Sequence, residues 1–346
     1  MGDPKKTKWT QPQPAPGGAL SDEQVDSWRT HGFALIEGLL PSDLIERVRS
    51  DAAAAFPAAG SPQSKRVTDF GSGGRLVFPS HSDAANELTL HPRLLAAVAR
   101  LLGVETLALR LTQSDLWVKY GRNDRSGGDR DNDDQRIHVD YPNHTLTHPP
   151  RWHEPEAVEV IVYLSDVDDC GGATAVVPRS GDDDPAYPWP IVATPGVAGL
   201  EWVNDRDSAE AYLEREVPDV ARWRAEHLYP REVHARFGTG TVLLYRHDTW
   251  HRGTPLEPGT MRAVHNLTFR KAGSEWVSTL HTGWAWAMYQ RSLPMERLIA
   301  RASVEQRCVL GFPAPGHRYW TPETVAAVGA RFGPLGMDMA PYENSL

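Results

Sequence analysis

The first hundred residues carry apolar positions at the spacing of amphipathic helices. Ser21, with Gln24 three residues later, is a capping-box pattern and predicts a helix that runs to about residue 31. A second helix is expected to begin at about residue 41, and a third to cover residues 91–102. These segments predict a group of helices that precedes the main body of the fold.

From about residue 105 onward, the apolar residues form short runs that are typical of strands. Glycine, proline and aspartate residues that favour turns separate these runs. Strands with no helix between each pair favour a barrel or a sandwich over a doubly wound sheet. The predicted strands are residues 33–36, 107–119, 158–164, 173–177, 237–245 and 263–269.

Two long polar insertions, 121–135 and 179–236, interrupt the strands, and the second contains a helical stretch near 208–226. The predicted fold class is therefore mainly β with flanking helices. We expect residues 1–20 to be a disordered tail and residues 21–346 to be a single domain. The expected parts of that domain are N-terminal helices (21–103), a β core (about 105–272) and a C-terminal extension (273–346).

Composition narrows the class of partner. The chain has 346 residues and a formal net charge of −9, with no basic stripe, which argues against a nucleic acid. Its two cysteines, Cys170 and Cys308, are too few for a disulfide framework or a four-cysteine zinc site, so we expect a cytoplasmic location. No apolar run approaches the ~18 residues of a membrane-spanning helix. We therefore expect a small-molecule substrate, and the oligomeric state stays open.

His138 and Asp140 form a His-x-Asp pair. On a strand, positions i and i+2 face the same side, so this pair would present one nitrogen and one oxygen ligand together. His251 follows a predicted strand, and if both segments line one barrel mouth, the three side chains would face one metal ion. Two imidazoles and one carboxylate are the facial triad of non-heme Fe(II) oxygenases, which leaves positions open for other ligands. His247 is the alternative distal ligand.

Arg262 opens a predicted strand soon after His251. A guanidinium that faces the interior of a barrel is costly unless it meets an anion. Its planar fork suits the distal carboxylate of a dicarboxylate cosubstrate. The alternative is a structural salt bridge to an aspartate or glutamate of the chain.

Several segments together resemble one known family. Residues 31–40 and 164–181, the His-x-Asp pair, Trp250 with His251, and Arg262 are similar to the phytanoyl-CoA dioxygenase family of Fe(II)/2-oxoglutarate oxygenases. The likeness covers most of residues 25–272. It implies a double-stranded β-helix, a jelly-roll or cupin-like barrel, with helices packed outside it.

The resemblance also implies the cofactors and their ligands. His138, Asp140 and His251 would hold Fe(II), and Arg262 would hold the distal carboxylate of 2-oxoglutarate, with dioxygen as the second cosubstrate. By analogy of position, we also expect Gln113 and Tyr163 to contact 2-oxoglutarate. For both of these residues, ordinary packing inside the barrel is the alternative.

The implied activity is that of a dioxygenase, a hydroxylase that oxidises an unactivated C–H bond of a small organic substrate, such as a specialised metabolite. Halogenating relatives have a small residue in place of the metal-binding carboxylate, so Asp140 favours hydroxylation or another oxidation. Two alternatives remain: a metal-dependent hydrolase or isomerase on a similar barrel, and a barrel that binds a ligand without catalysis. The sequence does not name the substrate.

Overall fold

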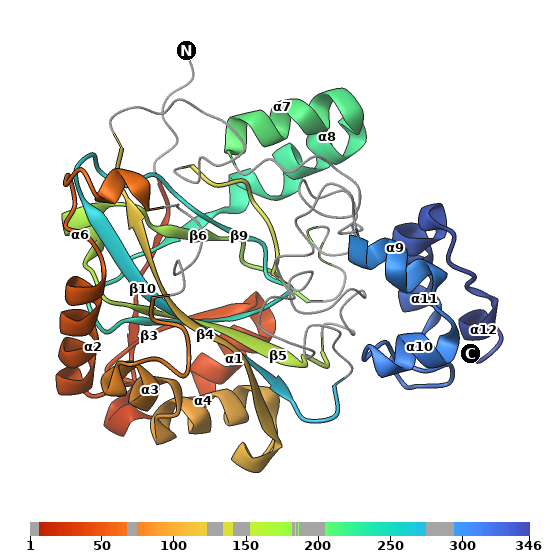
Figure 1. Cartoon of the computed structure of the whole chain (residues 1–346), viewed down its shortest axis with the longest axis horizontal. Helices are drawn as coiled ribbons and strands as arrows, with labels where there is room; N and C mark the ends of the chain where they lie inside the picture. Colours follow the sequence, from red (N-terminus) through yellow and green to blue (C-terminus); the bar gives the residue numbers. More distant parts are fainter. Residues whose placement is uncertain are drawn as a thin grey trace.

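The computed structural model describes residues 7–67, 75–122, 134–140, 153–181, 184, 186, 205–274 and 294–346 (Figure 1). The strands in these residues are β1 (Trp9–Thr10), β2 (Gln13–Pro14), β3 (Phe33–Glu37), β4 (Leu109–Tyr120), β5 (Ala157–Tyr163), β6 (Thr174–Val176), β7 (Val233–Ala235), β8 (Val242–Arg246), β9 (His251–Gly253) and β10 (Met261–Lys271). The α-helices are α1 (Asp22–His31), α2 (Ser42–Ala55), α3 (Asp83–Thr89), α4 (Pro92–Leu102), α6 (Val167–Cys170), α7 (Arg206–Glu216), α8 (Pro218–His227), α9 (Pro294–Arg301), α10 (Val304–Val309), α11 (Pro322–Phe332) and α12 (Ala340–Glu343).

The strands form two sheets. The larger has six strands in the order β2-β3-β8-β5-β10-β4, and the smaller has four in the order β1-β7-β6-β9. Neighbouring strands are antiparallel except where the N-terminal strands β1 and β2 join their sheets. The predicted class, mainly β with flanking helices, is confirmed.

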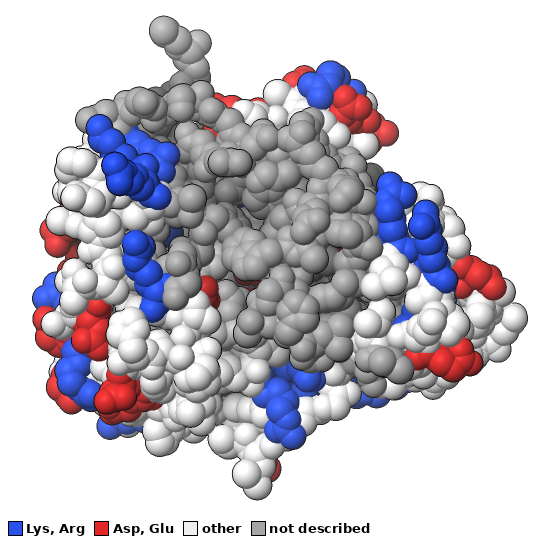
Figure 2. All heavy atoms as spheres, in the orientation of Figure 1, with Lys and Arg blue, Asp and Glu red and all other residues white. Residues whose placement is uncertain are grey.

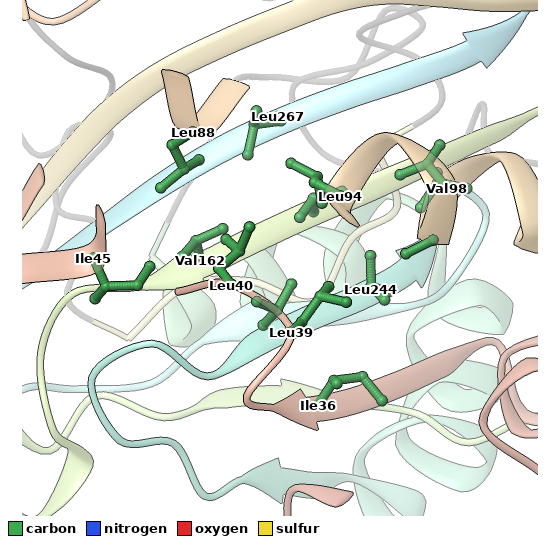
Figure 3. Close-up of a cluster of buried hydrophobic side chains, with 14 of the residues drawn as sticks. Ile36, Leu39, Leu40, Ile45, Leu88, Leu94, Val98, Val162, Leu244 and Leu267 are labelled. Atoms are coloured by element: carbon green, nitrogen blue, oxygen red, sulfur yellow. The ribbon is translucent and has the colours of Figure 1, made fainter. Parts of the chain in front are cut away.

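Alternate residues of the larger sheet face two different cores. In β5, Val158, Val160 and Val162 belong to a core that also contains apolar residues of α1–α4, which cover this face of the sheet (Figures 1 and 3). Ile161 and Tyr163 of the same strand belong to a second core, shared with residues of the smaller sheet. This alternation follows from the strand period of two, and it aims one set of β5 side chains at the space between the sheets.

The segment before α1 differs from the disordered tail that we expected. From Thr7 onward it lies along both sheets, because β1 pairs with β7 and β2 pairs with β3. Ala15 and Leu20 are buried in the helix-facing core. The polar composition did not predict this arrangement, because backbone hydrogen bonds hold the segment to the strand edges and such bonds require no apolar pattern in the sequence.

Two of the predicted helical segments are confirmed, one near the N-terminus and one in the second insertion. The capping box of α1 is present, because Ser21 accepts from the backbone of Gln24 and the Gln24 side chain accepts from Ser21. The helical stretch expected near 208–226 is two helices, α7 and α8, which meet at Val217 and Pro218. The break follows from proline, which begins a helix well but interrupts one.

The C-terminal helices α9–α12 have a hydrophobic core of their own. Phe312, Phe332 and Tyr342 are buried in it, with ring centroids near 6 Å apart around Phe312. Arg318 reaches Glu156 just before β5, with an N–O distance of 3.2 Å. These helices correspond to the extension predicted after residue 273, and the single-domain organisation stays a prediction.

The described part of the surface carries charges of both signs. On the face shown in Figure 2, basic and acidic side chains are interspersed around the rim. Among the described residues, no helix has both the length and the apolar character to cross a membrane.

A buried polar chain connects the larger sheet to α3. His265 of β10 lies 2.9 Å from the Ser114 hydroxyl, which lies 2.7 Å from Thr89, and Thr89 donates to the carbonyl of Ala85. Since the Thr89 proton is used on Ala85, Ser114 donates to Thr89 and His265 donates through Nε2. Burial lowers the pKa of His265 to about 4, so the ring is neutral in the folded protein at neutral pH.

Mild acid should therefore lower the stability of the folded state through His265. Its pKa falls from an ordinary value near 6.5 to about 4 on folding, so its contribution is present above about pH 6.5 and is lost as the pH falls towards 4. Between pH 7 and pH 5 we expect this residue to lower the free energy of unfolding by about 2 kcal/mol. His265→Gln keeps a donor for Ser114 and should remove that increment in urea unfolding at the two pH values. The exposed control His153→Gln should behave as the parent; an equal loss in His265→Gln and the parent would contradict the prediction.

Candidate metal centre

Two segments far apart in the sequence meet through their backbones at His138 and His251. The amide of His138 donates to the carbonyl of His251 at 2.9 Å, and the amide of His251 returns a bond at 2.8 Å. We expected His138 to lie on a strand, but residues 134–140 are an extended segment with isolated bridges at Gln135 and His138. His251 begins β9, so the pairing places the segment beside the smaller sheet.

The three predicted ligands lie together. Nε2 of His138 is 3.5 Å from Oδ1 of Asp140, and Nε2 of His251 is 3.3 Å from Oδ2 of the same carboxylate. One ligand atom from each residue lies within 4.8 Å of the others. Ligands ~2.1 Å from one ion at right angles would be ~3 Å apart, so this spacing fits a shared ion.

The histidine rings are oriented for ligation by their other nitrogens. Nδ1 of His138 lies 3.1 Å from the carbonyl of Arg136, and Nδ1 of His251 lies 3.0 Å from the carbonyl of Thr249. A carbonyl only accepts, so each Nδ1 carries the proton and each Nε2 presents its lone pair to the site. Burial, reinforced by the neighbouring His251, holds the pKa of His138 well below its usual range, which favours the neutral ring that binds metal.

Tyr245 holds the third ligand, and our sequence analysis missed this residue. Its hydroxyl donates to Oδ2 of Asp140 at 2.7 Å, and its ring centroid lies 4.7 Å from that of His251. Tyr245 ends an apolar run in β8, where an aromatic residue is as ordinary in a core as in a site. No local pattern in the sequence distinguished a role of Tyr245 in the core from a role in the site.

The strand register places a row of polar residues across the larger sheet, beginning at Tyr245. Tyr245 pairs with Glu159, Glu159 with Thr268, and Thr268 with Gln113. Glu159 is buried and accepts from the Thr268 hydroxyl. Burial, with Asp140 nearby, raises the pKa of Glu159 well above its usual range. The sequence analysis also missed Glu159, because a single acidic residue within an apolar strand has no motif around it.

Arg262 lies at the start of β10 and donates to the carbonyl of Gly172. Its Nε atom is enclosed and has no hydrogen-bond partner among the described residues, although the side chain as a whole is partly exposed. No carboxylate of the described residues forms a salt bridge with it. Burial lowers the pKa of Arg262, but a guanidinium stays charged at neutral pH. The structural salt bridge considered as an alternative is therefore absent from the described part of the chain.

Lys119, which pairs with Arg262 in the sheet, brings a second cation to the same place. A Cβ built on Gly253 would stand 3.5 Å from Nζ of Lys119 and 3.8 Å from Nη2 of Arg262. Gly253 is two residues beyond His251 on β9, which is ~7 Å along a strand and on the same side. The same Cβ would stand 3.3 Å from Oε1 of Gln135, so the two cations and this amide surround Gly253, two residues from His251.

The other predicted residues have the following places. Tyr163 lies near Arg262, and its hydroxyl donates to Thr174 at 2.7 Å; burial raises the pKa of Tyr163 to about 12, so the phenol is neutral at neutral pH. Gln113 donates to Asp115 at 2.9 Å and lies on the Tyr245 row. Contact of Tyr163 or Gln113 with 2-oxoglutarate stays a prediction.

His247 does not join the ligand set. Its backbone carbonyl accepts from the amide of Asp140 at 3.0 Å, so it supports the segment that carries the ligands. The group that could hold a metal among the described residues is His138, Asp140 and His251. The geometry therefore favours His251 over His247.

A family comparison agrees with this site. Residues 28–263 match the model of the phytanoyl-CoA dioxygenase family. The chain belongs to this family. No curated protein matches it significantly.

Solved structures with similar folds are distant in sequence. The non-heme α-ketoglutarate-dependent carbocyclase SnoK from nogalamycin biosynthesis is 16% identical, with 76% of this chain and 88% of that chain covered and a TM-score of 0.50. EvdO2 from Micromonospora carbonacea var. aurantiaca is 15% identical, with 73% and 92% covered and a TM-score of 0.48. HygX from Streptomyces hygroscopicus, with nickel and 2-oxoglutarate bound, is 20% identical, with 74% and 88% covered and a TM-score of 0.46.

The metal centre predicts different outcomes at the two neighbouring histidines. Changing His251 to Ala removes a ligand, so Ni(II) affinity measured by calorimetry should fall by more than the ~10–100-fold typical of changes in groups that only support a ligand. His247→Gln should bind Ni(II) as the parent does. Parent-like affinity in a folded His251→Ala variant would overturn the assignment, and circular dichroism would verify the fold of each variant.

Proposed function

We propose that the protein is an Fe(II)- and 2-oxoglutarate-dependent dioxygenase that hydroxylates, or otherwise oxidises, an unactivated C–H bond of a small organic molecule. The observation that carries this proposal is Arg262. Its guanidinium has no carboxylate partner among the described residues, and it lies beside Gly253, two residues from His251 of the His138, Asp140 and His251 site. An anchor for a dicarboxylate beside a facial triad is what this chemistry requires.

Each part of the site has a task in this scheme. His138, Asp140 and His251 would hold iron, which when bound supplies the activation of dioxygen. Arg262, with Lys119, would bind the distal carboxylate of 2-oxoglutarate and orient its 2-oxo acid end towards the triad. Tyr245 would hold the Asp140 carboxylate in one orientation. The apolar walls between the sheets would exclude water from the reacting C–H bond.

The fold supports the proposal at the level of architecture. We propose that the two facing sheets are the walls of a double-stranded β-helix and that residues 21–346 form one oxygenase domain. We further propose a cytoplasmic enzyme with a small-molecule substrate, such as a specialised metabolite. The acidic composition and the two cysteines support the location and the partner class.

Hydroxylation is the proposed outcome, within a wider class of oxidations. The similar structures include a carbocyclase and, in SnoN, an epimerase, so proteins of similar fold carry out more than one type of reaction. Asp140 occupies the position that a halide would need, which opposes halogenation. A hydrolase or isomerase has no need for Arg262 as a dicarboxylate anchor, and a non-catalytic barrel has no need for three ligands.

Cosubstrate turnover tests the proposal. Purified protein with Fe(II), 2-oxoglutarate and dioxygen should release succinate, and a true substrate from a metabolite panel should stimulate that release. Omitting iron or oxygen should abolish it. A hydrolase, an isomerase or a non-catalytic barrel would release none under any of these conditions.

Truncation of Arg262 should weaken cosubstrate binding and leave metal binding intact. Loss of a charge-assisted contact, which also leaves a carboxylate unpaired, costs about 2–5 kcal/mol, or roughly 30- to 3,000-fold in the 2-oxoglutarate constant. Arg262→Lys should recover part of this, because it keeps the charge and loses the fork. The matched control is the exposed Arg110→Ala on the neighbouring strand β4. An unchanged constant in Arg262→Ala would remove the proposal's main support.

Reactions in chloride buffer should yield oxygenated or otherwise oxidised product without chlorination, because Asp140 blocks halide access to the metal. Mass spectrometry of the product distinguishes the two outcomes. Asp140→Ala should lose oxidation. A chlorinated product from the unmodified protein would contradict this prediction.

A further inference from the structure

The helices α7 and α8 lie within the second polar insertion and beside the metal-binding segments. Figure 1 shows them side by side above β6 and β9. Residue 205, immediately before α7, forms a bridge with Gln135, and the amide of Arg206 donates to the carbonyl of Asp134 at 2.8 Å. The start of α7 is therefore attached to the extended segment that carries His138 and Asp140.

Arg224 of α8 reaches the residue next to His138. It is 1% exposed, and its Nη2 donates to the carbonyl of Ile137 at 3.0 Å. Because His138 uses its own amide and carbonyl on His251, the peptide groups of its neighbours point to the opposite edge of the segment. Ile137 is fully buried, so its carbonyl needs a donor there, and Arg224 supplies it.

A carboxylate fixes the orientation of Arg224. Glu210 of α7 accepts from Nε at 3.0 Å and from Nη2 at 2.7 Å, a two-pronged contact that sets the plane of the guanidinium. The Tyr229 hydroxyl also donates to Glu210. The guanidinium further lies 5.9 Å from the ring centre of Trp250, the residue before His251. One arginine thus contacts the immediate neighbours of two ligands.

A second arginine connects the same helix pair to the strand of the distal ligand. Arg252, directly after His251, pairs with Asp134 and with Glu232, whose Oε1 lies 2.6 Å from Nε. Asp134 also faces Arg206 of α7 at 3.8 Å. The ion pairs therefore join both ligand segments and the insertion in one network.

We infer that the insertion holds the metal ligands in register and that Arg224 is the positioning residue through which it acts. This inference rests on the proposed metal site, which it extends with a task for the 179–236 insertion. His138 and Asp140 lie on one short extended segment, and Arg224 holds the backbone of that segment on the side away from His251. The expected consequence is a site that is formed before metal binds.

Metal affinity and ligand-field spectra of the full-length metal-free chain test the inference. Arg224→Gln should weaken Ni(II) binding about tenfold, at the lower end of the range for groups that support ligands, and should alter the visible spectrum of the Co(II)-loaded protein. Arg224→Lys, with charge and one donor, should lie between it and the parent. The matched control is Arg222→Gln on the same helix; Arg222 is exposed and pairs with Asp219 at 3.1 Å.

A merely structural arginine would lower the unfolding midpoint and leave both metal readouts unchanged. A folded Arg224→Gln variant with parent-like Ni(II) affinity and Co(II) spectrum would overturn the inference. If Arg224→Gln does not fold, Glu210→Gln decides, because it frees the same guanidinium from its partner: weaker Ni(II) binding supports the inference, and parent-like binding overturns it. Failure of the parent to bind Ni(II), with His251→Ala equal to it, would instead refute the proposed function.

Discussion

The two backbone hydrogen bonds between His138 and His251 are the constraint on which the site depends. They join segments that the chain separates by most of its β core, and they fix the two ligands at the separation of a hydrogen-bonded antiparallel pair, ~5.5 Å between Cα atoms. The imidazole rings then lie 4.4 Å apart, with Asp140 reaching both. Backbone pairing, rather than contact between the side chains, thus determines the shape of the ligand set.

The alternation of side chains along each strand also determines which residues of the larger sheet face the site. Most of the residues that face α1–α4 are apolar and build the main core, with His265 and Ser114 as polar exceptions, while the residues between them face the smaller sheet and can be polar. Register places Glu159 and Thr268 beside Tyr245, which holds Asp140, and places Lys119 beside Arg262. One sheet therefore supports both the metal end and the cationic end of the site. A one-residue shift would move both sets into the helix-facing core.

Local signals in the sequence predicted the parts of the structure that depend on neighbours in the chain. The capping box at Ser21 predicted the start of α1, and the His-x-Asp pair with His251 predicted the three side chains that the fold brings together as candidate metal ligands. Tyr245 and Lys119 were missed because their roles arise from strand pairing, which joins residues with no pattern in common. The ordered N-terminal strands were missed for the same reason, since backbone bonds to a sheet edge leave no trace in composition.

The arginines differ in whether the described chain supplies a carboxylate partner for them. Arg224, Arg246 and Arg252 are each almost fully buried, and each faces a carboxylate in the chain: Glu210, Asp248 and Glu232. Such pairing offsets much of the cost of placing a charge away from water. Among the described residues, Arg262 has the Gly172 carbonyl and the nearby Tyr163 and Cys170 around it, with Lys119 beside it in the sheet. In a chain that pairs these other buried guanidiniums internally, the lack of a carboxylate partner for Arg262 among the described residues supports the proposed dicarboxylate anchor, and Gly253 places that guanidinium two residues from His251.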